Sequence, residues 1–391
     1  GRLLDQSKSL SAQGVRAGAA LTLEPLGEGA SDMVYDDLTE AVGQVVERVS
    51  TPWTREDART LAALSAAGLV FVAALLLATT PPDALTALDP KAVTRYNVIA
   101  GAIGIVAALL VTATSAVMTR KHPQASGIAL AHTVPFLTAA SALRLSQSHW
   151  DTAGWGWTGL GLLIGSLAVL ALPKRSRISI AAPLVVGTVL AATGLLVRLG
   201  QLSQAGISAI LFALVIVLLQ VAPWIALAHI PVRILDADTT EQIPAKGITD
   251  QISTSFMFVV ALRAGGAIAA LFLAVALMTA PETRSVSLPL TLIVLGAVSL
   301  VLQTRSIRAR VEVLLGALTG LIVILVAAVL GAYADPRTMP WLTLSAIATA
   351  LVLVITNVVG PRARPHLTRI ADTISVLSLF VLLPLAVYLW S

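Results

Sequence analysis

A series of apolar segments, each close to the length of a membrane-crossing helix, dominates the chain and leaves most of its charges in short connections. A hydrocarbon core about 30 Å thick is crossed by a helix of about 20 apolar residues. Segments of this kind predict about eleven spans. They run over residues 60–80, 97–119, 125–143, 155–172, 178–197, 206–230, 254–280, 287–304, 312–333, 340–360 and 370–390. The sequence therefore predicts an all-α polytopic membrane domain over residues 60–391.

Composition supports a bilayer as the solvent for most of the chain. Hydrophobic residues make up 57% of it and charged residues 12%, whereas soluble globular domains are roughly 25% charged. The net charge of +5 comes from short basic runs between apolar stretches, without a basic stripe that carries interleaved aromatic residues. Nucleic-acid binding is therefore not expected. The chain has no cysteine, which excludes disulfides, thiolate metal sites and a cysteine nucleophile.

Basic residues gather in alternate connections of the predicted spans. The denser runs lie at 120–121, 174–177, 305–310 and 362–369, and the connections between them hold only scattered single basic residues. Cytosolic loops of membrane proteins carry the excess of Lys and Arg. The pattern predicts that residues 1–59 face the cytosol and that Ser391 faces the opposite side, because the predicted number of spans is odd.

The predicted loop 231–255 is the longest cytosolic connection, and its charge differs from that of the others. Its charged residues are Arg233, Asp236, Asp238, Glu241, Lys246 and Asp250, so acids outnumber bases. Long connections between spans tend to be functional or disordered. We interpret these residues as a docking element for a partner. An idle loop remains an alternative, as does a metal-binding D-x-D motif at Asp236 and Asp238, which the predicted cytosolic location disfavours.

Two ionisable residues lie inside predicted spans. His132 precedes Pro135 by about one turn, and a proton relay is one interpretation. We favour a packed histidine bonded to a carbonyl that the proline frees. Arg263 could line a polar path, but it lies a few turns from the cytosolic end of its span. We favour a side chain that extends to the membrane interface or contacts another subunit.

Motifs with known chemistry are absent from the sequence, which contains no P-loop, no H-E-x-x-H and no G-x-S-x-G. No Asp or Glu lies near the middle of a predicted span, although ion-coupled carriers usually bury such carboxylates. We predict no catalytic, cofactor-binding or metal-ligating residue. Small residues at Gly161 and Gly165, and at Gly316 and Gly320, predict close helix packing, without indicating the partner helix.

Residues 1–24 resemble the last third of a ubiquitin-like domain. The resemblance rests on Gly1-Arg2-Leu3-Leu4-Asp5, Lys8-Ser9-Leu10, Gln13-Gly14-Val15, Gly18 and Leu21-Thr22-Leu23. Residues 32–50 then repeat apolar side chains at helical spacing, with acids in the first half. This order predicts the C-terminal part of a ubiquitin-like (β-grasp) domain at 1–26, an amphipathic helical linker at 27–59 and the membrane domain. The whole arrangement is similar to EccD, the membrane subunit of type VII (ESX) secretion systems.

The resemblance implies a non-enzymatic scaffold or channel-region subunit of a protein-secretion complex in the bacterial inner membrane, with Ser391 in the periplasm. It also implies a homodimer with a second copy of the chain, and contacts with EccB, EccE, the ATPase EccC and membrane lipids. It implies no cofactor. A secondary transporter of unknown substrate and a lipid- or sugar-transferring membrane enzyme are the competing hypotheses. The lack of mid-membrane carboxylates, of repeat symmetry and of an outer catalytic loop weighs against both.

Overall fold

The structure is a computed structural model, and it describes the membrane part of the chain. The described residues are 13, 55–79, 90–121, 125–148, 151–172, 180–200, 202–228, 245–282, 285–304, 310–350 without 341, 345, 348 and 349, and 364–390. The chain divides into two units, residues 1–54 and 55–391. The predicted ubiquitin-like segment 1–26 and most of the predicted linker 27–59 lie outside the described residues, and both remain predictions.

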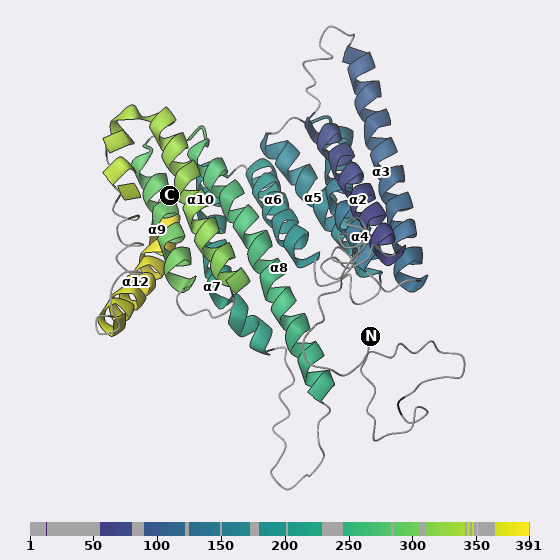
Figure 1. Cartoon of the computed structure of the whole chain (residues 1–391). Helices are drawn as coiled ribbons and strands as arrows, with labels where there is room; N and C mark the ends of the chain where they lie inside the picture. Colours follow the sequence, from purple (N-terminus) through teal and green to yellow (C-terminus); the bar gives the residue numbers. More distant parts are fainter. Residues whose placement is uncertain are drawn as a thin grey trace, which may run out of the picture. The chain divides into compact units, whose positions relative to one another are not determined.

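The described residues of the second unit are almost entirely helical, and no strand is found among them (Figure 1). The helices are α2 (Arg55–Thr79), α3 (Pro90–Lys121), α4 (Ala125–Leu145), α5 (Thr152–Leu170), α6 (Ala181–Gly200), α7 (Gln204–Ala228), α8 (Ala245–Met278), α9 (Ser287–Gln303), α10 (Arg310–Ala334), the 3-10 turn η6 (Pro336–Thr338) and α12 (Arg364–Trp390). An α-helix satisfies all interior backbone groups within one segment, as hydrocarbon surroundings require. The prediction of an all-α polytopic membrane domain is confirmed.

Helix boundaries follow local sequence signals where a cap is present. Asp151 precedes α5 with an extended backbone, and its side chain accepts a hydrogen bond from the Gly154 backbone N–H at 2.8 Å. This contact satisfies one of the backbone donors that every helix start leaves unpaired. The short connection between α4 and α5 therefore ends at a residue suited to begin the next helix.

Nine helices among the described residues are long and apolar enough to cross a membrane. α9, with 17 residues, is shorter but apolar and matches the predicted span 287–304. The predicted span 340–360 is described only up to residue 350, and its described residues are helical. The total of eleven spans therefore stays a prediction. α8 begins at Ala245, well before the predicted start at 254, because its first turns are polar and invisible to a search for apolar segments.

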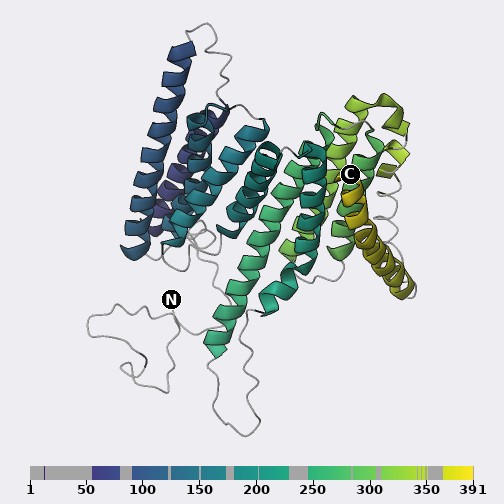
Figure 2. The same ribbon diagram turned by 180° about the vertical axis from the view of Figure 1, so that it is seen from behind.

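The membrane helices form two groups that meet at α6 and α8. In the first group, α2 and α3 pack on α4, α4 packs on α5, and α5 packs on α6. In the second, α8 packs on α7 and α10, α9 packs on α10, and α12 packs on α7 and α9. The α6–α8 contact joins the groups, and Figures 1 and 2 show these two helices side by side from both directions.

Each group has an apolar core, and both cores are rich in alanine. The core of the second group contains fully buried large side chains, including Phe212, Ile216, Leu273 and Leu292. Alanines and valines make up much of the first core, as at Ala131. Central helices α4 and α7 bury 61% of their span residues, but α2, α10 and α12 bury only 17%. The latter three helices therefore lie at the edges of the domain, where their apolar side chains can face lipid or another protein.

Candidate functional site

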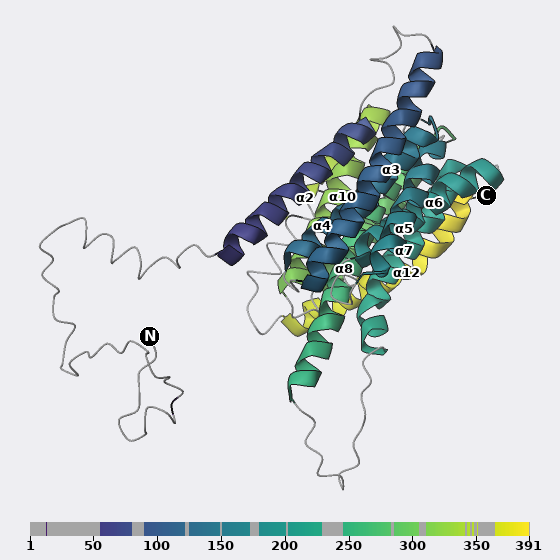
Figure 3. The same cartoon turned by 90° about the vertical axis from the view of Figure 1, so that its right-hand side faces the viewer.

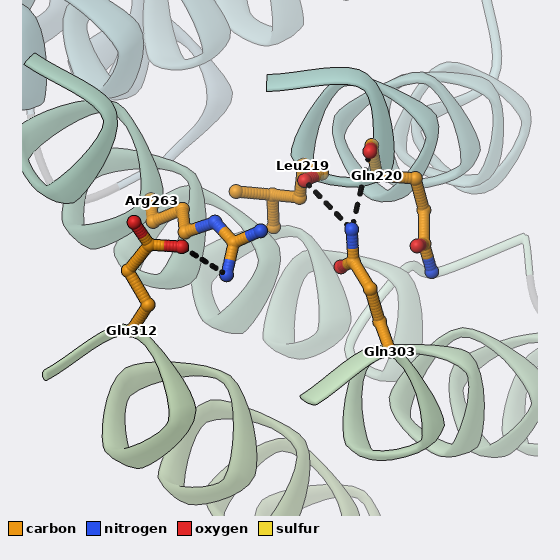
Figure 4. Close-up of polar contacts among 5 residues, drawn as sticks. All are labelled: Leu219, Gln220, Arg263, Gln303 and Glu312. Carbon is orange, nitrogen blue, oxygen red and sulfur yellow. Dashed lines mark hydrogen bonds and ion pairs between the residues drawn. The ribbon is translucent and has the colours of Figure 1, made fainter. Parts of the chain in front are cut away.

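A buried ion pair joins α8 to α10 in the second helix group. The Arg263 Nη1 atom lies 3.3 Å from the Glu312 Oε2 atom, and the two residues are only 5% and 8% exposed. Figure 4 shows the two side chains pointing toward each other from neighbouring helices. A charged side chain buried among apolar helices without a partner would be strongly unfavourable. Pairing makes the contact electrically neutral as a whole, which allows both side chains to stay inside the domain.

Amide side chains connect α9 to α7 beside this pair. The Gln303 Nε2 atom donates to the backbone carbonyl oxygen of Gln220 at 3.1 Å and to that of Leu219 at 3.5 Å (Figure 4). In the opposite direction, the Gln220 Nε2 atom donates to the Ser299 hydroxyl at 2.6 Å. Pro223, four residues after Leu219, has no backbone N–H, so the Leu219 carbonyl lacks its helical donor and Gln303 supplies one. Four helices, α7 to α10, thus meet at one polar cluster.

A small cavity lies inside the cluster. Its volume is about 10 Å³, and it is lined by Leu219, Arg263, Leu300, Gln303, Leu315, Gly316 and Thr319. The Arg263 Nε and Nη2 atoms are buried and have no hydrogen-bond partner among the described residues. Arginine presents its N–H donors in a rigid planar fork, so the edge formed by Nε and Nη2 is distinct from the group that faces Glu312.

A second buried arginine joins the helices of the first group. The Arg144 Nε atom, in the last turn of α4, donates to the Leu77 carbonyl oxygen at 2.5 Å, and Nη1 donates to the Asn97 Oδ1 atom at 3.4 Å. Arg144 and Asn97 are 6% and 7% exposed. The guanidinium thus links the end of α2 to α3 and α4. Sequence analysis placed Arg144 among the scattered charges of the connections and missed this contact.

A larger apolar cavity of about 290 Å³ lies between the two groups, lined by residues of α2, α4, α5, α6 and α8. Two edge-to-face aromatic pairs, Phe71–Phe136 and Trp155–Phe272, contribute to its surroundings. Of the described residues that line it, Thr79 and Thr158 alone have polar side chains, and both hydroxyls donate to carbonyls of their own helices. The cavity therefore has no uncommitted donor aimed at a polar ligand.

Comparison with known proteins gives the chain a family. The family described as "EccD-like transmembrane domain" matches residues 58–391, which include every membrane helix from α3 to α12 and nearly all of α2. The chain belongs to the EccD family. The family resemblance predicted from the sequence is thereby confirmed. No curated protein sequence matches the chain.

Solved structures with a similar fold come from type VII secretion complexes. The structure described as "Structure of protomer 1 of the ESX-3 core complex" is 17% identical with a TM-score of 0.64, and the match covers 93% of this chain and 82% of that one. A chain of the "MycP5-free ESX-5 inner membrane complex, State II" is 16% identical with a TM-score of 0.57, over 83% and 78% of the two chains. At these identities the likeness concerns the fold.

Most of the docking residues predicted for this EccD-family chain lie outside the described residues. These are Arg233, Asp236, Asp238 and Glu241. Lys246 and Asp250 lie in the first two turns of α8, where the backbone is described. The predicted loop 231–255 therefore overlaps α8, which begins at Ala245, and its part from 245 to 255 is helical. The docking role itself remains a prediction.

The glycines predicted to pack helices closely lie against neighbouring helices of the same chain. A Cβ added at Gly161 would lie 2.5 Å from the Thr138 carbonyl oxygen, and at Gly165 it would lie 2.6 Å from the Pro135 Cα atom, so both positions bring α5 against α4. On α10, a Cβ at Gly320 would lie 2.9 Å from the Ala297 carbonyl oxygen, and one at Gly316 would lie 2.7 Å from a Thr304 methyl carbon. These close approaches are geometric facts of the fold, and a role in contacts with another copy remains a prediction.

The structure places both intramembrane ionisable residues, and the interpretation of His132 needs correction. The Arg263 guanidinium is buried and pairs with Glu312 in the first turn of α10, so this partner belongs to the same chain. A position of Arg263 at the membrane interface, or a contact with another subunit, stays a prediction. His132 is half-buried, and its Nδ1 atom lies 2.6 Å from the Ile128 carbonyl oxygen. The carbonyl freed by Pro135 belongs to Ala131, four residues earlier, so the expected partner was wrong by one turn. No sequence signal identifies Glu312 as the partner of Arg263, because the two lie far apart in the chain.

Proposed function

We propose that the chain is a non-catalytic scaffold subunit of a type VII protein-secretion complex. It is a multi-pass membrane protein of the EccD family, and the family match over residues 58–391 is the observation that carries the proposal. The fold likeness to chains of ESX-3 and ESX-5 membrane complexes supports it. The polar side chains described above also fit a structural role, because their partners are other helices of the same domain.

The proposal places the chain in a complex with an EccC-type ATPase and with EccB- and EccE-type subunits. An acidic cytosolic connection supports the contact on that side. Its residues Asp236, Asp238 and Glu241 precede a helix that enters the membrane domain, so a partner bound there would act directly on α8. Exposed ion pairs contribute about 0.2–1 kcal/mol each, and several together would make docking sensitive to salt.

We also propose that two copies associate through the edges of the membrane domain. The edge helices α2, α10 and α12 bury only 17% of their span residues. Leu69, Leu325 and Phe380 are examples of their exposed apolar side chains, at 71%, 60% and 76% exposure. Such faces can meet lipid or a second copy, and the family resemblance favours a homodimer. The basic runs predict a cytosolic N-terminus and a periplasmic Ser391.

Native mass measurement of the gently solubilised complex tests the scaffold proposal. The chain carries an affinity tag at its C-terminus and is purified from its own membranes. We expect an assembly many times the 40.5 kDa of one chain, with an ATPase among its components and two copies of this chain in each crosslinked unit. A purified monomer without co-purifying subunits would contradict the proposal and favour a secondary transporter.

Replacing the acidic connection tests docking separately. Residues 236–244 are exchanged for a Gly/Ser linker of equal length, which leaves α8 intact from Ala245. We expect the protein to insert normally and the large complex to fall into subcomplexes, more so at high salt. The matched control reorders residues 236–244 without changing their composition. Equal stability of the linker variant and the native complex would refute docking through this segment and leave the family assignment untouched.

A further inference from the structure

The open edge of the Arg263 guanidinium faces a cavity of defined size. Arg263 is 5% exposed, and its Nη1 atom contacts Glu312. Its Nε and Nη2 atoms are buried and have no partner in the part of the chain that the structure describes. Buried donors of this strength are satisfied in nearly all known structures. The adjoining cavity is lined by Arg263 itself, by Gln303 of α9 and by Thr319 of α10. A hydrogen-bond acceptor placed there would meet both donors at once.

The size of the cavity and the charges beside it together determine which acceptor can bind there. The cavity volume of about 10 Å³ corresponds to the space that one water molecule needs, roughly 10–15 Å³. A phosphate or carboxylate group exceeds that volume. An anion would also leave an unbalanced negative charge inside the domain, because Arg263 and Glu312 already neutralise each other. A cation would be repelled by the positive charge of the guanidinium. The ligand must therefore be small and neutral.

Gln303 provides the geometry for a second contact. Its Nε2 atom donates to the carbonyl oxygens of Leu219 and Gln220, which fixes the plane of the side-chain amide. Figure 4 shows the Gln303 Oε1 atom on the side that faces Arg263. An oxygen atom in the cavity could then accept from Arg263 and donate to Gln303, and buried waters usually make about three such contacts.

We propose that the junction of α8, α9 and α10 binds one buried water molecule. The water accepts hydrogen bonds from the Arg263 Nε–H and Nη2–H groups and donates one to the Gln303 Oε1 atom. It connects α9 to the ion pair between α8 and α10. The remaining polar lining residue, Thr319, donates its hydroxyl to the Leu315 carbonyl oxygen of its own helix. The inference concerns this chain's own residues and stands whether or not the scaffold proposal is correct.

X-ray radiolytic labelling of the purified full-length complex, read by mass spectrometry, tests the proposal. Hydroxyl radicals formed from a bound water oxidise adjacent side chains that bulk solvent does not reach. Leu300 lines the small polar cavity and Leu162 lines the large apolar one, and both are 4% exposed. We expect several-fold more oxidation at Leu300 than at Leu162, because an apolar cavity stays dry. Equal oxidation of the two leucines would overturn the proposal.

A pair of variants identifies the water's contacts. Gln303→Leu removes the proposed acceptor, and Gln220→Leu removes a glutamine of the same cluster that does not line the cavity. We expect the excess oxidation at Leu300 to disappear in the first variant and to persist in the second. Persistence in a folded Gln303→Leu variant would overturn the assignment. If this variant does not fold, the comparison of Leu300 with Leu162 in the native protein decides the question alone.

Discussion

The two helix groups are held together by different means. In the first group, backbones approach closely where glycines face other helices, as at Gly161 against α4 and Gly194 against Gly156 of α5. In the second group, large apolar side chains such as Phe212 and Ile216 fill the core. There, Arg263, Glu312 and two glutamines cross from helix to helix (Figure 4). The first group also has polar contacts between helices, from Arg144 to Leu77, from Ser115 to Gly127 and from Thr138 to Gly161.

The comparison shows which interactions stabilise a membrane domain when the hydrophobic effect between helices is weak. Lipid tails are as apolar as leucine, so burying a leucine between helices provides little driving force. Close van der Waals packing through small residues is one remaining source of stability, and interhelical hydrogen bonds are another. Both groups draw on both sources, and the second adds a buried ion pair between Arg263 and Glu312. The two groups should therefore differ in the kinds of mutation that they tolerate.

The largest expected effect comes from breaking the ion pair in the second group. Glu312→Ala leaves the Arg263 charge buried without its partner, which typically lowers the free energy of unfolding by about 3–5 kcal/mol. The measurement is equilibrium unfolding of the purified chain in mixed micelles. The control replaces both Arg263 and Glu312 by methionine, and we expect it to approach the native stability, because apolar replacement of a whole buried pair is often neutral. A double variant as unstable as the single one would show that charge imbalance is not the cause.

A methyl group placed in the first group should have the next largest effect. Gly161→Ala puts a Cβ 2.7 Å from the Ala139 Cα atom, so α4 and α5 must separate, at a cost of about 1–3 kcal/mol. Gly68→Ala on α2 is the matched control, because its Cβ meets nothing within 4 Å. It should be neutral or stabilising by up to about 1 kcal/mol through helix propensity. Equal melting temperatures for the two variants would refute close packing at Gly161.

The smallest expected effect concerns the hydrogen bond between Gln220 and Ser299. A double-mutant cycle with Gln220→Met and Ser299→Ala should give a coupling energy near 0.6 kcal/mol, the average for interhelical hydrogen bonds in membranes. The 2.6 Å contact is the basis for expecting any coupling. A coupling energy well above about 2 kcal/mol would mean that the cluster acts as a network rather than as separate pairs.

Much of the fold could be predicted from the sequence because the bilayer imposes a length on each apolar segment. The segments at 125–143 and 287–304 correspond closely to α4 and α9. The largest error was the start of α8, where a helix continues beyond its apolar span through Lys246 and Asp250. Hydropathy reports the solvent around a residue and not its backbone conformation, so polar turns at the end of a helix resemble a loop.

The polar cluster could not be predicted in the same way. Arg263 was recognised as a charge inside a predicted span, but its pairing with Glu312 depends on which faces of α8 and α10 meet. That choice is made by side-chain packing over several helices and leaves no periodic signal in the chain. Arg144 shows the same limit, because its main partner is the backbone carbonyl of Leu77, to which the identity of residue 77 contributes little.

The length of α8 has a mechanical consequence. The helix runs 34 residues without a proline, and its apolar span begins only at Ser255. From Ala245 to Arg263 it forms a rigid arm of roughly 27 Å, taking a rise of 1.5 Å per residue. Figures 1 and 3 show its first turns running past the end of α6. Just beyond Arg263, Gly265 meets the backbone of Ala182, so α8 is clamped there against α6. A small sideways force on the projecting end would therefore rotate α8 about this contact with α6. Arg263 lies next to the contact, so its ion pair would be among the first interactions to be disturbed.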